Sequence, residues 1–138
     1  MTAYATSAEL QDYLGEDDFL RVADRDGSGA VDADAVTQAL DEASSLADSY
    51  LARWLPIASA PPVLRRHVMA IAAYSLAGNL QTDDQRRRYE DAIKWLRDVA
   101  DGKASLGIPP SSDTVSSGSV HYATNTRVLT RSTLRGVL

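Results

Sequence analysis

The chain has 138 residues, which is enough for one domain with a substantial hydrophobic core. It contains no cysteine, which excludes disulfides, thiolate chemistry and cysteine-ligated zinc, and its longest apolar run, VMAIAAYSLA at 68–77, is too short to cross a bilayer. The net charge of −5 and the isoelectric point near 4.9 argue against a general nucleic-acid-binding protein. The N-terminus lacks a basic segment followed by an apolar run, so we expect no signal peptide.

Two short helices are expected at the start of the chain. The segment TSAE at 6–9 is a capping box, in which Thr6 is the N-cap and Glu9 bonds back to it. The first helix should run from there to Leu14 and stop at Gly15. The segment EDDFLRVAD at 16–24 predicts a second helix, with acids in its first turn where the helix dipole favours them.

The segment DRDGSGAVDADA at 24–35 follows the pattern of an EF-hand calcium loop in part. Asp24, Asp26, Ser28 and Asp32 occupy loop positions 1, 3, 5 and 9, but position 12, which requires a bidentate Glu, is Ala35. We expect at best a weak calcium site at these four residues. The favoured interpretation is a sharp turn that ends one helix and starts the next, because Asp and Gly suit caps and left-handed backbone.

Three longer helices are expected after the loop, over about 33–54, 62–77 and 83–100. The first has apolar residues at steps of three and four, and the second begins at Pro61 and Pro62 and becomes apolar nearly all round, which places it at the centre of the core. The third opens with a capping box at Thr82 and Gln85 and ends before Gly102. The predicted fold is therefore all-α, a small helical bundle of four to five helices over residues 1–103.

Residues 104–138 form a segment of different character, rich in Ser, Thr and Gly, and we expect it to be an extended C-terminal arm. In TRVLTRSTLRGVL, Arg127, Leu129, Arg131 and Arg135 alternate with residues that include Leu134, a period of two that suits a β-strand. A lone strand cannot satisfy its own backbone groups, so the arm is expected to become a strand on assembly with another chain. A disordered tail is the alternative.

No residue set for catalysis is recognisable, so we expect neither an enzyme nor a cofactor. His67 and His121 lack a carboxylate partner at a recognisable spacing, and no phosphate-binding Gly loop or nucleophile motif occurs. Arg86, Arg87 and Arg88 are consecutive on a helix and fan around it, which favours a solvated or subunit-facing patch over a DNA site. Trp54 is expected to fill a core or subunit contact.

The charge is unevenly divided along the chain. Residues 1–60 hold 3 basic and 12 acidic residues, whereas residues 61–138 hold 11 basic and 7 acidic residues. A chain divided in this way can pack against copies of itself, acidic face to basic face, although both sets could equally be solvated.

The order of these motifs resembles the Mu-like bacteriophage and prophage family of head–tail adaptor, or connector, proteins. The resemblance covers nearly the whole chain, and its most specific parts are the Asp/Gly turn at 24–32, RYEDAIKWLRDVADGK at 88–103 and TRSTLRG at 130–136. One departure is Trp54, where the family pattern leads us to expect Tyr.

The resemblance implies a non-enzymatic virion protein at the neck, assembled in the host cytoplasm. Such proteins form a ring of about twelve copies on the portal protein, around the channel for packaged DNA, and carry the stopper or tail-completion protein. On this interpretation Arg127, Leu129, Arg131, Leu134 and Arg135 bind the portal or a neighbouring copy. Arg86, Arg87, Arg88 and Trp54 would face a neighbouring subunit, and the calcium-binding module is the alternative function.

Overall fold

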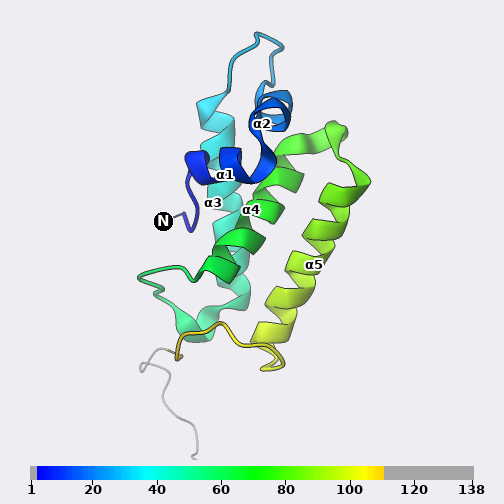
Figure 1. Cartoon of the computed structure of the whole chain (residues 1–138). Helices are drawn as coiled ribbons and strands as arrows, with labels where there is room; N and C mark the ends of the chain where they lie inside the picture. The colour runs from blue at the N-terminus through cyan, green and yellow to red at the C-terminus, as the bar shows by residue number, and fades with distance from the viewer. Residues whose placement is uncertain (1–2, 111–138) are drawn as a thin grey trace, which may run out of the picture.

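The computed structural model describes residues 3–110, and Figure 1 shows their arrangement as a bundle of helices. The α-helices of this part of the chain are α1 (Ser7–Leu14), α2 (Glu16–Ala23), α3 (Ala33–Tyr50), α4 (Pro62–Ala77) and α5 (Asp83–Ala100). Two short 3-10 helices follow α3 and α4, at Ala52–Trp54 and Gly78–Leu80. The prediction of a small all-α bundle is confirmed.

Helix α4 is the centre of the bundle, with α3 packed on one side and α5 on the other (Figure 1). It buries residues around most of its circumference, as predicted from its apolar sequence. Helices α3 and α5 present narrower apolar stripes to it, and α1 and α2 cover one end of the layer. The fully buried large side chains of this core are Leu10, Val36, Leu51, Leu64, Val68, Leu96 and Val99.

The helix starts are fixed by the capping residues that the sequence predicted. Thr6 and Thr82 each form a complete capping box, with Glu9 and Gln85 respectively. The carboxylate of Asp32 accepts the backbone N–H of Ala35 at 3.1 Å and so caps α3. Each cap satisfies backbone donors that a helix start leaves without an intrahelical partner, and contributes about 1 kcal/mol.

The third helix ends earlier than predicted, at Tyr50 and not at residue 54. The backbone N–H of Leu51 bonds to the carbonyls of both Ala47 and Asp48 at 3.1 Å, so the helix tightens there into the 3-10 turn that carries Trp54. Pro56 follows, and a proline disfavours helical backbone at the residue before it. The periodic apolar pattern continues through this change because the side chain of Trp54 still packs against the core.

The N-terminal segment is tied to α3 by Tyr4. Its backbone N–H donates to the Ser44 hydroxyl at 3.0 Å, and that hydroxyl donates to the Leu40 carbonyl at 2.8 Å. The Tyr4 hydroxyl donates to the carboxylate of Asp48. Burial, and then this hydrogen bond, raise the pKa of the Tyr4 phenol well above its ordinary value. Ser44, one of two buried polar side chains in residues 3–110, is thereby fully bonded.

The last described residues, 104–110, pack on the opposite end of the bundle from α2. Leu106 is buried in the core, and Ala104 and Ile108 lie against it. The backbone N–H groups of Lys103 and Ala104 both bond to the Asp98 carbonyl, at 2.7 and 3.1 Å. Core contacts therefore extend past residue 103, where the arm was predicted to begin. None of the helices within residues 3–110 is both long and apolar enough to span a membrane.

Candidate interaction surfaces

The Asp/Gly loop projects from the end of the bundle and joins α2 to α3 (Figure 1). The Asp24 carboxylate accepts the backbone N–H groups of Ser28 at 3.0 Å and Gly29 at 2.8 Å. The Asp26 carboxylate accepts the N–H of Ser28 at 3.1 Å, and hydrogen bonds from Ser28 lower the pKa of Asp26. Carboxylates thus fold the loop by bonding to its own backbone, which is the chemistry of a turn.

The loop also requires glycine at two positions. Gly27 and Gly29 have φ values of 71° and 82°, in the left-handed region that other residues rarely adopt. Asp32 is committed to its cap, and its own N–H bonds to the Ala23 carbonyl at 2.9 Å. Across residues 3–110, no three His, Cys, Asp or Glu side chains are grouped so that they could hold a metal ion. The geometry supports the helix-connector interpretation of the loop.

Asp24→Ala is expected to lower the free energy of unfolding by about 1–2 kcal/mol, because two loop N–H groups lose their acceptor. The loss should be the same with and without about 10 mM calcium, a concentration that would fill a weak site. Urea unfolding followed by tryptophan fluorescence measures both. Asp34→Ala, which removes a neighbouring exposed carboxylate without a hydrogen bond to the loop, is the control. A calcium-dependent stability that Asp24→Ala abolishes would instead establish a calcium site.

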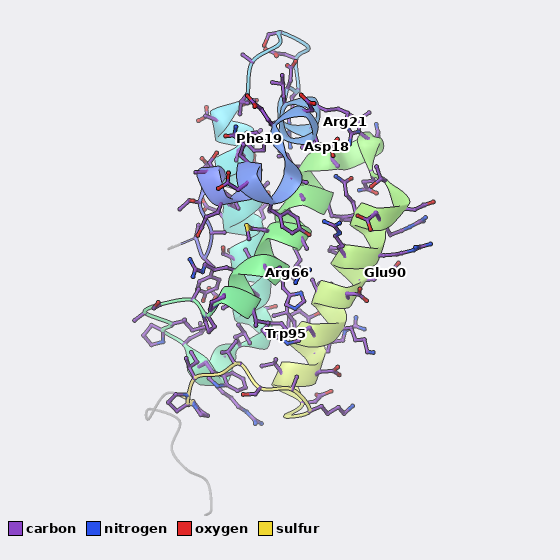
Figure 2. All side chains as sticks on the ribbon, in the orientation of Figure 1. Asp18, Phe19, Arg21, Arg66, Glu90 and Trp95 are labelled. Atoms are coloured by element: carbon purple, nitrogen blue, oxygen red, sulfur yellow. The ribbon has the colours of Figure 1, made fainter. Side chains whose placement is uncertain are left out.

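A pocket of about 190 Å³ opens between α1, α4 and α5. It combines positive charge with apolar surface, since two guanidinium groups stand beside the half-exposed Val63. Figure 2 labels Arg66 on α4 and Trp95 on α5, two of the helices that border the pocket. The pocket is lined by Tyr13, Val63, Arg66, His67, Ala70, Arg88 and Asp91.

Most polar side chains of this pocket are held in place by aromatic contacts. The His67 ring stacks on Trp95 with centroids 4.6 Å apart. The Arg88 guanidinium lies 5.5 Å from the centre of the Tyr13 ring, donates to its hydroxyl at 3.3 Å and pairs with Asp84 at 2.8 Å. Arg66, by contrast, is exposed and forms no ion pair with another described residue. The pocket is therefore a rigid concave surface with one available cation.

Burial is the largest cause that lowers the pKa of His67, and the neighbouring Arg66 adds to it, although Asp91 opposes both. The neutral ring is thus favoured in the folded chain. The unfolded chain binds a proton at His67 near pH 6.5, whereas the folded chain does so only at lower pH. The contribution of His67 to the free energy of unfolding is therefore fully present above about pH 6.5. It is lost as the pH falls from there through the lower pKa that His67 has in the folded chain.

His67→Phe is expected to flatten the loss of stability between about pH 7 and about pH 5, because phenylalanine keeps the stack on Trp95 but binds no proton. Urea unfolding at the two pH values, compared between the original chain and the variant, gives the difference. His121 is present in both chains, so its contribution to the pH dependence cancels in the comparison. An equal pH dependence in the two chains would show that His67 titrates normally when folded.

The three consecutive arginines of α5 do fan around the helix. Arg86 pairs with Asp83 and Arg88 pairs with Asp84, one turn away, and both arginines are exposed. Such exposed pairs contribute little to stability. Trp54 is half-buried at the end of α3 and packs against the core. Their predicted role at a subunit interface stays a prediction. The predicted arm residues Arg127, Leu129, Arg131, Leu134 and Arg135 lie outside the described residues.

The outward face of α3 is acidic and polar. The helix contains four acids and no basic residue, whereas α4 contains Arg65 and Arg66 and no acid. Within residues 3–110, no cation forms an ion pair with any carboxylate of α3. A shallow depression runs along this face and is lined by Asp34, Thr37, Gln38, Asp41, Glu42 and Ser45.

The pocket and the Tyr4 contacts were not predicted from the sequence. Tyr13 and Arg88 are 75 positions apart, and Tyr4 and Ser44 are 40 apart, so no local pattern connects them. The one available signal is the spacing of Arg88, Asp91 and Trp95, which places three polar or aromatic residues on one side of α5 next to its apolar stripe.

Comparison with known proteins gives matches over much of the chain. Residues 4–124 match the family model described as Bacteriophage Mu, Gp36. The chain is 44% identical over 90 residues to the Mu-like prophage FluMu protein gp36 of Haemophilus influenzae, and the match covers 64% of each chain. It is 34% identical over 82 residues to Gene product J of Escherichia phage Mu, covering 58% of each. It thus spans less than two thirds of both relatives.

Proposed function

The chain belongs to the bacteriophage Mu Gp36 family, and we propose from this premise that it is a head–tail adaptor of the phage particle. In this role it docks as a ring on the portal protein and joins the DNA-filled head to the stopper and tail. The observation that carries the proposal is the family match, which continues beyond the helical bundle into the arm, to residue 124. The adaptor role itself comes from the resemblance of the motif order.

The helical bundle supports this role as a rigid binding unit. Its pocket holds His67 by stacking on Trp95, and Arg88 by its contact with Tyr13 and its ion pair with Asp84. A concave surface of this kind suits docking of another protein, and we propose that the chain acts by binding and not by catalysis. The acidic face of α3 and the exposed Arg66 offer contacts of opposite charge to neighbouring subunits.

We propose that the arm forms main-chain hydrogen bonds with a different protein. Residues 3–110 contain no β-strand, so the bundle of a neighbouring copy offers no sheet edge within that range. If the arm adds as a strand, its partner is therefore another arm or a separate protein with a sheet edge. The portal is the partner that we propose, with the stopper protein bound on the opposite side and packaged DNA in the channel.

The mass of the complex formed with the portal protein of the same genome tests the proposal. Light scattering on a sizing column should show a ring that gains about one adaptor per portal subunit, as closed symmetry requires. The portal of an unrelated phage is the matched control and should gain no mass. If the chain binds neither an empty portal nor a DNA-filled head, the adaptor proposal is wrong.

A further inference from the structure

We propose that the Asp/Gly loop of one copy of this chain docks into the pocket between α1, α4 and α5 of a second copy. The anchor of the contact is Val31, which packs against Val63 of the other copy, and beside it Asp34 forms an ion pair with Arg66. The inference rests on the proposed function in one respect, since it names the surfaces by which neighbouring copies meet in the ring. The contact itself can be measured without the portal.

The pocket presents an apolar side chain next to a cation that has no partner in its own chain. Val63 and Arg66 are three residues apart in the first turns of α4, and both line the pocket. Val63 is 50% exposed, and Arg66 is exposed and forms no ion pair with another described residue. The volume of about 190 Å³ is below the range of about 300–1,000 Å³ that is usual for small-molecule sites, so the pocket suits a single side chain of a protein partner.

The charge of the pocket favours one carboxylate. Its lining contains Arg66, Arg88 and Asp91, so two arginines and one aspartate give a net charge of +1. Arg88 is already engaged by Tyr13 and Asp84, which leaves the guanidinium of Arg66 for an incoming group. A net charge this small matches a single acidic side chain and not a polyanion such as nucleic acid.

The loop carries the complementary pair of side chains. Val31 is 41% exposed, and Asp34 follows it by three residues, exposed and without an ion pair to another described residue. The two side chains line the same depression. The carboxylates of Asp24, Asp26 and Asp32 are bonded to backbone N–H groups of the loop and the start of α3. Asp34 is therefore the carboxylate that is available to a partner.

The two pairs of side chains do not meet within one chain. The loop projects from the end of the bundle, whereas the pocket is formed by side chains of α1, α4 and α5, and no residue of 24–34 lines it (Figure 1). A second copy is therefore the occupant that brings the loop to the pocket. Because the two surfaces differ, the contact is head-to-tail, and contacts of this kind close into rings when the rotation between copies allows it.

Disulfide trapping between two different chains tests the contact, because the natural chain has no cysteine. One chain carries Val31→Cys and the other, which is isotope-labelled, carries Val63→Cys, so that a small apolar side chain remains at each position. The matched control for the second chain is Leu80→Cys, because Leu80 is 51% exposed and lies in the turn between α4 and α5. The measurement is the rate at which the mixed dimer forms, read by mass, at about 1 mM of each chain, a concentration suited to a contact of millimolar Kd.

The Val63→Cys chain should form the mixed dimer about five-fold faster than the Leu80→Cys control, which is the upper end of what one surface ion pair supplies. Adding Arg66→Asp to the Val63→Cys chain should lower the rate to that of the control, and adding Asp34→Arg to the Val31→Cys chain should then restore it. Circular dichroism of each variant checks the fold. Equal rates for Val63→Cys and Leu80→Cys, or a rate that Arg66→Asp leaves unchanged, would overturn the proposal.

The result is separate from portal binding. A mixed dimer formed by a chain that adds no mass to the portal would support the contact between copies and count against the adaptor role. Portal binding by the original chain, together with equal crosslinking rates, would overturn the contact alone.

Discussion

Removing residues 111–138 is expected to leave a folded chain that no longer binds the portal ring. The truncated chain keeps every residue of the described core, of which Leu106 is the last, and it retains residues 104–110. Portal affinity should fall at least about 100-fold if the arm docks as proposed, since the truncation would then remove three arginines and the main-chain bonds of a strand from the interface. Light scattering of the mixture with the portal measures the binding, and thermal unfolding of the free chain measures the fold.

A matched full-length control separates charge from backbone pairing in this experiment. The triple variant Arg127→Glu, Arg131→Glu, Arg135→Glu keeps the length of the arm and reverses its anchoring charges. It should bind the portal nearly as poorly as the truncated chain if the arginines provide the anchor. A truncated chain that unfolds like the original and still forms the ring would show that the bundle alone carries the portal contact.

Leu96→Ala is expected to lower the free energy of unfolding by about 3 kcal/mol, within the usual range of about 2–5 kcal/mol for a buried leucine. Leu96 is 0% exposed and lies in the core on α5, which packs against α4. The substitution removes buried methyl groups and leaves a cavity that the neighbouring helices cannot fill. Urea unfolding followed by circular dichroism gives the value.

Leu80→Ala is the control for this substitution, because Leu80 is 51% exposed in the turn between α4 and α5. It should change the free energy of unfolding by less than about 0.5 kcal/mol, as is usual for surface positions. A Leu96→Ala effect as small as that of the control would mean that α5 does not pack tightly on α4. The arm and α3 would then need to be considered as alternative partners of its apolar stripe.

Local chemistry made most of the fold predictable. Thr6 and Thr82 start their helices because a hydroxyl and a carboxylate or amide three residues later satisfy the first N–H groups, and this requires no other part of the chain. Apolar sequence patterns similarly predict how much of a helix is buried by its neighbours. The pattern is a stripe on α5 and covers nearly the whole circumference of α4.

The parts that sequence did not predict depend on side chains brought together by the fold. The stack of His67 on Trp95 needs α4 and α5 to pack at one particular register, and periodicity does not set register. The early end of α3 lies where the backbone N–H of Leu51 bonds to the carbonyls of both Ala47 and Asp48, a change that the apolar period does not indicate. The Asp/Gly loop illustrates the opposite case, in which a pattern shared with calcium loops forms a turn through its own backbone bonds.

The central position of α4 also determines the order in which this chain can acquire its core. Its two main neighbours in space, α3 and α5, are also its neighbours along the sequence, so these contacts close short loops and should form rapidly, as in other helical bundles. During synthesis, however, α4 leaves the ribosome before α5 does, with its α5-facing side uncovered. The nascent chain thus passes through an interval in which apolar surface is exposed, and that interval ends only when Tyr89, Leu96 and Val99 have also emerged.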